Sequence, residues 1–278
     1  VGGSFAIVVA DNKTHATLGE GTALNIDGDF RATATHHGAT TNTAKGDAAG
    51  GTAVGAAIAL SFVSDEAVAS TDRNLLADGS IAFEAFADGL STVQATASAA
   101  GADKSEEGSA GNSKANDQTG KQTDVADAKS NRTNEQGTER TSANSSSGDV
   151  SVAAAIGLNV AESTARAHIT AGRTVRADND GDNAGTGTLA LRATNNMDAT
   201  TNADGSAKTS SGGDSVGVAV AINVADMTNE ASIGNGSTIS ADGLTVRATM
   251  KDVAGDETHR FGATSRSGAS GANGTSRT

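Results

Sequence analysis

The chain has 278 residues, of which 36% are hydrophobic and 2% aromatic, and it contains no Pro, Cys, Trp or Tyr. Its formal net charge of -13 disfavours binding to nucleic acid, and the lack of Cys excludes disulfide frameworks, zinc–thiolate clusters and cysteine nucleophiles. No apolar run approaches the length of about 18 residues that a transmembrane helix needs.

Four alternating apolar runs follow one another along the chain, at residues 5–9, 54–62, 152–160 and 216–224. The larger side chains stand at every second position, with smaller or polar residues between them. A period of two places one set of side chains on a single face of a β-strand. Each run therefore predicts one strand of the same kind.

A second strand is expected downstream of each run, after a turn that contains glycine. These segments share an apolar residue, a charged residue and Ala: Phe30-Arg31-Ala32, Phe83-Glu84-Ala85, Leu191-Arg192-Ala193 and Val246-Arg247-Ala248. Such agreement indicates one supersecondary unit used four times. We expect one repetitive β domain over 1–278, with repeats at approximately 1–48, 49–147, 148–211 and 212–278.

The second repeat contains a polar insert at 98–147, which is rich in Lys, Asp, Ser, Asn and Gly. Taken alone, this composition is typical of a disordered or solvated segment. Long polar hairpins and additional solenoid turns are the other interpretations.

The predicted fold class is all-β, a parallel β-solenoid with long polar insertions. Val, Ile, Leu and Ala would fill an interior one or two side chains wide, and the absence of Pro suits uninterrupted ladders. Two or three coils per repeat would give roughly 8–12 coils and a rod of about 40–55 Å. Stacked antiparallel hairpins or a β-sandwich are the alternative, because a period of two does not separate them.

The segment Asp11-Asn12-Lys13-Thr14-His15-Ala16, followed by a glycine turn and a strand ending in Ala-Thr-Ala, resembles repetitive bacterial exoproteins. These are the filamentous-haemagglutinin-like and leukotoxin-type adhesins of two-partner secretion or autotransport. The resemblance implies a right-handed β-helix, export to the extracellular space or outer cell surface, and a role in adhesion or in a biofilm matrix.

Asp178, Asp180 and Asp182 form the candidate metal site, because carboxylates beside amides and a glycine suit an oxygen-seeking cation such as Ca²⁺. The closing position of a calcium loop is Leu189 instead of Glu, so a solvated Asp/Asn turn is the competing interpretation. No other cofactor is expected.

No catalytic constellation is visible, and we expect no enzyme. His36 and His37 would point to opposite faces of a strand, and the pair is interpreted as a surface feature. Arg31, Arg192 and Arg247 could share an outer face if acids such as Glu84 interleave with them.

The expected function is a structural, adhesive segment of an extracellular filament or giant adhesin that self-assembles end to end. Its partners would be neighbouring repeats of the same chain or further copies, together with a cell-surface or polysaccharide ligand. A calcium-dependent binding module is the alternative, and a polysaccharide-acting solenoid enzyme ranks below it. The chain itself is expected to be a window from a longer array or a stacking subunit.

Overall fold

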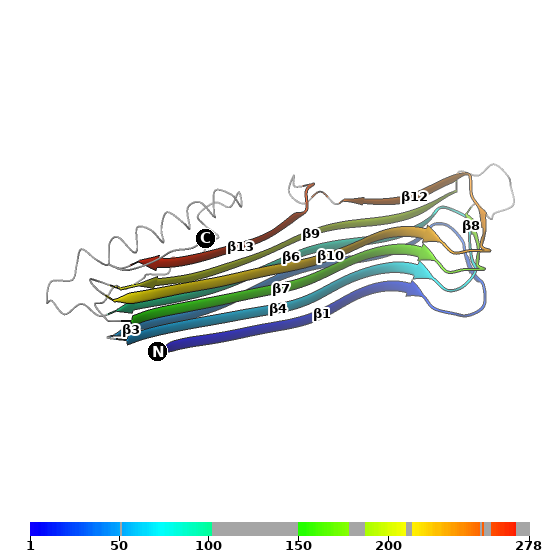
Figure 1. Cartoon of the computed structure of the whole chain (residues 1–278). Helices are drawn as coiled ribbons and strands as arrows, with labels where there is room; N and C mark the ends of the chain where they lie inside the picture. Colours follow the sequence, from blue (N-terminus) through cyan, green and yellow to red (C-terminus); the bar gives the residue numbers. More distant parts are fainter. Residues whose placement is uncertain are drawn as a thin grey trace.

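The computed structural model describes residues 1–50, 52–101, 150–177, 187–209, 213–250, 252 and 257–270. These residues form a parallel β-solenoid, which confirms the predicted fold class (Figure 1). Every pairing between its strands is parallel, so the antiparallel alternative is wrong. The described residues contain no helix.

Each coil consists of a long strand, a short strand and a second long strand. The strands are β1 (Gly2–Leu18), β2 (Leu24–Ile26), β3 (Phe30–Gly50), β4 (Thr52–Thr71), β5 (Leu75–Ala77), β6 (Ile81–Gly101), β7 (Val150–Ile169), β8 (Thr174–Ala177), β9 (Thr188–Lys208), β10 (Asp214–Ile233), β11 (Thr238–Ser240), β12 (Gly243–Met250) and β13 (Arg260–Ser270). In the last coil β12 and β13 together replace the second long strand, and both pair with β9.

Three parallel sheets result, which we call sheets A, B and C. Sheet A has the order β1-β4-β7-β10, sheet B the order β2-β5-β8-β11, and sheet C the order β3-β6-β9-β12 with β13 beside β9. Equivalent residues stack in columns, for example Phe5, Ile58, Ile156 and Val220 in sheet A. The coils therefore superimpose without a register shift, and each coil matches one set of sequence motifs.

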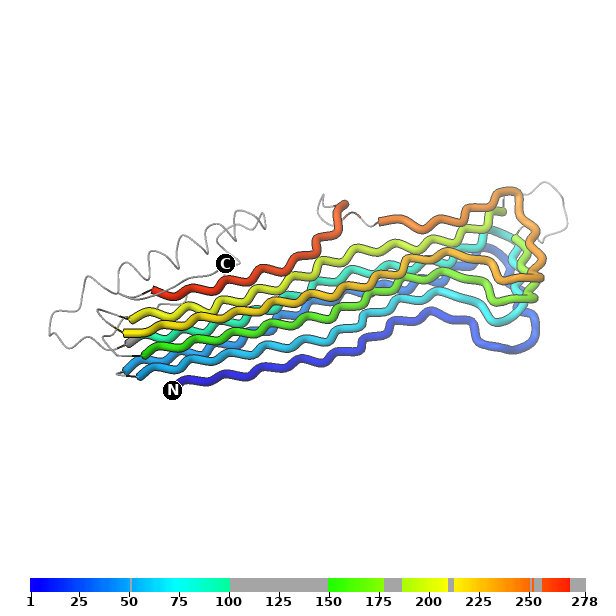
Figure 2. Tube along the Cα trace, viewed as in Figure 1, coloured from blue at the N-terminus to red at the C-terminus, as the bar shows by residue number. Residues whose placement is uncertain are grey.

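The number of coils was predicted wrongly, because the described residues of each repeat form one coil and not two or three. A strand of 20 residues such as β7 extends for roughly 66 Å, so two such strands use most of a repeat. The four coils rise by only about 14 Å from the first strand of a sheet to the last. Figure 2 shows the resulting flat, elongated body, with sheet B closing one end.

The interior is widest beside sheet B, where it contains the large core side chains. Leu75, Phe83, Ile169 and Leu191 are fully buried there. The ring of Phe83 lies 5.5 Å from that of Phe30. The short strand holds sheets A and C apart, which leaves room for these residues.

Towards the opposite end the interior narrows to alanine and glycine. A Cβ added at Gly46 would lie 1.8 Å from the carbonyl oxygen of Ala56, and one at Gly205 would lie 1.8 Å from that of Val218. Sheets A and C thus meet nearly backbone to backbone, closer than the usual sheet separation of about 10 Å.

Between these two regions the interior is polar, and hydrogen bonds cross it from sheet to sheet, although the buried Ser61 and Thr92 hydroxyls have no partner. Ser91 Oγ donates to Asn159 Oδ1 at 2.7 Å, and Asn159 Nδ2 donates to Asn223 Oδ1 at 3.0 Å. Asn223 Nδ2 in turn donates to the carbonyl of Ala199 at 3.0 Å. These bonds join sheets A and C, and a register slip in either sheet would leave buried amide groups unpaired.

The apolar runs of sheet A correct the expectation about the interior. Ala57 and Ala59 point inward and are fully buried, whereas Ile58 and Leu60, which alternate with them, lie on the outer face. The narrow gap between the sheets is lined mainly by methyl groups, and Val93 is the one larger aliphatic residue of this buried cluster among the described residues. Val, Ile and Leu line the interior near sheet B, whereas in the four runs Val8 is the one inward-pointing residue of these types.

Candidate functional site

The end coils expose the edges of all three sheets. Within the described residues, β1, β2 and β3 pair on one side only, as do β10, β11, β12 and β13 at the other end. Each end also presents core side chains that are only partly buried: Leu18 and Leu24 on the first coil, Ile233 and Ile239 on the last. These end residues belong to columns whose middle members, such as Ile169 and Leu75, are fully buried.

Half of the backbone groups of the edge strands point away from the adjacent coil, and some of these bond to side chains, as the Ala219 N–H does to Ser267 Oγ at 3.0 Å. The carbonyl of Leu18 accepts a hydrogen bond from the N–H of Asp72 at 2.7 Å, and the N–H of Phe30 donates to the carbonyl of Ser80 at 2.8 Å. Alternate residues of a parallel strand bond to opposite neighbours. Thr17 and Arg31 consequently direct their backbone groups away from the second coil, which leaves a template for strand addition.

The outer face of sheet A has a continuous apolar half, which we call the apolar face. It consists of three columns of four large hydrophobic side chains, a fourth column of three, and Val218 beside them: Phe5, Ile7, Val9, Val54, Ile58, Leu60, Phe62, Val152, Ile156, Leu158, Val160, Val216, Val218, Val220, Ile222 and Val224. Exposed fractions are 62% at Phe5, 40% at Ile156 and 50% at Val224. Large apolar side chains in this number on one flat surface indicate an interaction site.

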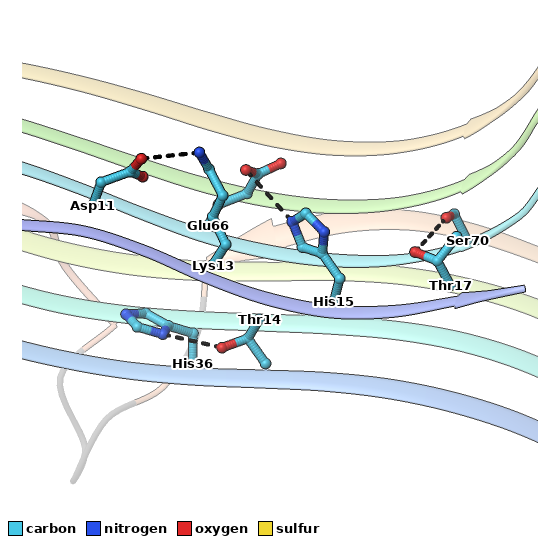
Figure 3. Close-up of polar contacts among 8 residues, drawn as sticks. All are labelled: Asp11, Lys13, Thr14, His15, Thr17, His36, Glu66 and Ser70. Atoms are coloured by element: carbon cyan, nitrogen blue, oxygen red, sulfur yellow. Dashed lines mark hydrogen bonds and ion pairs between the residues drawn. The ribbon is translucent and has the colours of Figure 1, made fainter. Parts of the chain in front are cut away.

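The other half of the same outer face is polar and mostly acidic. Lys13 Nζ lies 3.0 Å from Asp11 Oδ2, and His15 Nε2 lies 3.5 Å from Glu66 Oε2 (Figure 3). Further along, Arg166 pairs with Glu230 on the neighbouring coil. A hydrogen bond from Ser232 and the nearby Arg166 charge hold the pKa of the Glu230 carboxyl below its ordinary value.

The interpretation of His36 as a surface residue is wrong, because its ring lies between sheets A and C. His36 Nε2 is 3.0 Å from Asp65 Oδ1, and the two side chains are only 11% and 6% exposed. Thr14 Oγ1 lies 3.3 Å from His36 Nδ1 (Figure 3). Asn12 Nδ2 donates to Asp65 Oδ1 at 2.9 Å. The two sheets shield this cluster, so its contacts chiefly compensate a buried carboxylate.

No sequence pattern indicated that the Asp65 carboxylate would be buried, although two glycines of sheet C accommodate it. A Cβ at Gly38 would lie 2.5 Å from Asp65 Oδ2, and one at Gly89 would lie 3.3 Å from it. Adjacent histidines do point to opposite faces, since His37 lies outside with Nδ1 3.2 Å from Asp88 Oδ2.

The expected interleaving of acid and arginine is present on the outer face of sheet C. Glu84 is nearly buried and pairs with Arg31 and with Arg192, the latter at 3.1 Å. Arg247 stacks on Arg192 in register. One carboxylate thus bridges the first three coils.

The predicted metal ligands Asp178, Asp180 and Asp182 lie outside the described residues, so the calcium hypothesis stays a prediction. Within the described residues, no group of three or more His, Asp or Glu side chains is arranged to hold a metal ion. That part of the chain also contains no helix with the length and apolar character needed to span a bilayer.

Comparison with known proteins gives no relative from which a function could be transferred. No family model, no curated protein and no solved structure matches the chain.

Proposed function

We propose that the chain is a structural segment of an extracellular bacterial surface filament or large adhesin, in which coils continue by stacking on one another. The observation behind this proposal is the pair of open coil edges on a four-coil parallel solenoid. A further coil on either side, from the same polypeptide or from another copy, would satisfy the free backbone groups.

The core columns support the same mode of growth. Leu18 of the first coil occupies the position equivalent to Ile233 of the last coil, and Leu24 occupies the position equivalent to Ile239. Stacking would place aliphatic side chains on aliphatic side chains, and it would bury surface that the end coils leave partly exposed. The polar parts of the outer faces would remain available for contact with a cell surface or a polysaccharide.

The resemblance of the repeat motifs to those of secreted adhesins supports the extracellular part of the proposal. Labelling of intact, unpermeabilised producer cells with an antibody against the folded chain tests this part of the proposal. Labelling that appears only after permeabilisation would contradict it.

The stacking itself is tested with a variant in which both edge strands of the first coil lack one free N–H. Thr17 and Thr41 face outward on β1 and β3, at positions whose N–H groups point away from the second coil. The double variant Thr17→Pro/Thr41→Pro removes two N–H donors from the edges without removing a backbone hydrogen bond within the solenoid, since Pro is tolerated on edge strands. It does remove the hydroxyl of Thr17 that accepts a hydrogen bond from Ser70 Oγ at 3.1 Å. Thr17→Val/Thr41→Val is the matched control, because it removes the same hydroxyls and keeps both N–H groups.

Electron microscopy and sedimentation velocity of the purified chains provide the measurement. We expect the wild type and the valine control to form particles elongated along the stacking axis, and the proline variant to remain at four coils. Particles of four coils for all three chains at high concentration would refute edge stacking, and so would undiminished elongation of the proline variant.

A further inference from the structure

We propose that the apolar face of sheet A binds the same face of a second copy of this chain, with the strands of the two copies antiparallel. This contact is separate from coil stacking, because the face lies perpendicular to the sheet edges. It would join two solenoids side by side, whatever number of coils each contains.

The size of the apolar face suits such an interface. Nine residues of each long run, such as 152–160, span roughly 30 Å, and four strands span roughly 19 Å. The flat footprint is therefore roughly 600 Å² per copy, or about 1,200 Å² for a pair, the lower bound for specific interfaces. Accessible area exceeds this footprint because side chains project from the sheet.

The shape of the apolar face is also complementary to itself. Its strands run in register without an offset, so the side chains form straight columns. Two β-sheets with such faces pack by interdigitation about 10 Å apart. Under a two-fold axis along the stacking direction, Ile58 and Ile156 near the middle column would meet their own counterparts, and Val152 would meet Val160 of the second copy.

Charge determines the relative orientation of the two copies. The polar half of the outer face contains Asp11, Glu66, Glu162, Asp226 and Glu230, but only Lys13 and Arg166 as permanent cations. With parallel strands the polar halves would overlap and place Asp11 against Asp226. With antiparallel strands the polar halves extend in opposite directions, away from the contact.

The same charges argue against a lipid surface as the occupant. The net charge of the chain is -13, and the polar half beside the apolar face is acidic. Anionic headgroups would be repelled by this surface, and no basic border is present on the described part of the outer face of sheet A to attract them.

Crosslinking through single cysteines tests the orientation, because the chain has no Cys of its own. Ile156→Cys places a thiol beside the two-fold axis, and Thr164→Cys places one on the polar half of the same strand. In the antiparallel dimer the Thr164 positions would be roughly 53 Å apart, whereas the Ile156 positions face each other across about 10 Å. This separation is too long for a disulfide but suits a short bis-maleimide.

Both cysteine variants are made in the Thr17→Pro/Thr41→Pro background, so that coil stacking does not contribute. We expect crosslinked dimers from Ile156→Cys and none from Thr164→Cys. Efficient crosslinking of Thr164→Cys would overturn the antiparallel orientation. A monomer in sedimentation equilibrium, without crosslinking of either variant, would overturn the dimer while leaving the stacking proposal to its own test.

A charge substitution measures the strength of the contact. Ile156→Lys places a charge at the centre of the interface twice, and we expect the dimer dissociation constant to rise more than tenfold. Thr164→Lys adds the same charge outside the contact and should change it less than about twofold. Cosedimentation of the wild type with phosphatidylcholine vesicles, lost in Ile156→Lys, would instead assign the face to a lipid surface and refute the proposal.

Discussion

The closest approach of sheets A and C makes Gly205 a sensitive position. A Cβ there would lie 1.8 Å from the carbonyl oxygen of Val218, whereas ordinary contacts begin at 3.4 Å. Gly205→Ala must therefore separate the two backbones by about 1.6 Å or turn the Val218 carbonyl out of its ladder. Overpacking of this kind costs about 1–3 kcal/mol, and a lost ladder hydrogen bond costs about 1 kcal/mol more.

We expect the free energy of unfolding of Gly205→Ala to fall by about 2–4 kcal/mol. Urea unfolding followed by far-UV circular dichroism measures the change, since the chain has no Trp or Tyr for fluorescence. Gly262→Ala is the matched control on β13 of the same sheet, where a Cβ would meet no atom within 4 Å. Equal stability of the two variants would refute the close backbone contact. The second coil has Ala97 at the position equivalent to Gly205, so the contact at issue is the one in the third coil.

Three further predictions concern charged groups. Burial raises the pKa of the Asp204 carboxyl, so the folded chain loses stability as pH rises from the unfolded pKa through the folded one. Asp204→Asn should therefore be more stable than wild type in urea at neutral pH, and the two midpoints should converge below about pH 4. Burial lowers the pKa of His168, so stability falls as pH falls below the unfolded value of about 6.5. His168→Gln should flatten this loss in thermal melts between about pH 7.5 and 5.5, and an unchanged pH profile would contradict it. Glu84→Gln should cost about 1–3 kcal/mol in urea unfolding, because a nearly buried carboxylate accepts hydrogen bonds from two arginines; a loss that is insensitive to salt concentration would argue against an electrostatic origin.

The parallel solenoid could be predicted because motifs that recur four times favour the stacking of equivalent strands, although a period of two alone also allowed antiparallel hairpins. The orientation of those strands could not be predicted from hydrophobicity, since both alternating sets are apolar in the runs. Ala57 and Ile58 are both suitable core residues by composition. Only the gap between the sheets decides that Ala57 is inside and Ile58 outside, and that gap depends on Gly46 and Gly55 in neighbouring strands.

The polar cluster shows a second limit of sequence reasoning. His36 and Asp65 are 29 residues apart and come from different coils, so no local spacing connects them. Their contact depends on how sheet C folds back over sheet A, which the irregular repeat lengths obscure. The acid–arginine contacts of Glu84 were easier to predict from the sequence, because its arginine partners belong to the same motif in other repeats.

The long strands give the molecule unusual proportions for the number of residues used. A coil such as β4–β6 takes 50 residues, from Thr52 to Gly101, and adds only about 4.8 Å of height. Each ångström of axial reach thus consumes about ten residues, far more than a solenoid with short strands would need. An assembly of such coils would be a broad tape and not a thin thread, and it would resist bending within the plane of its width. Most of its residues would add lateral surface and few would add length.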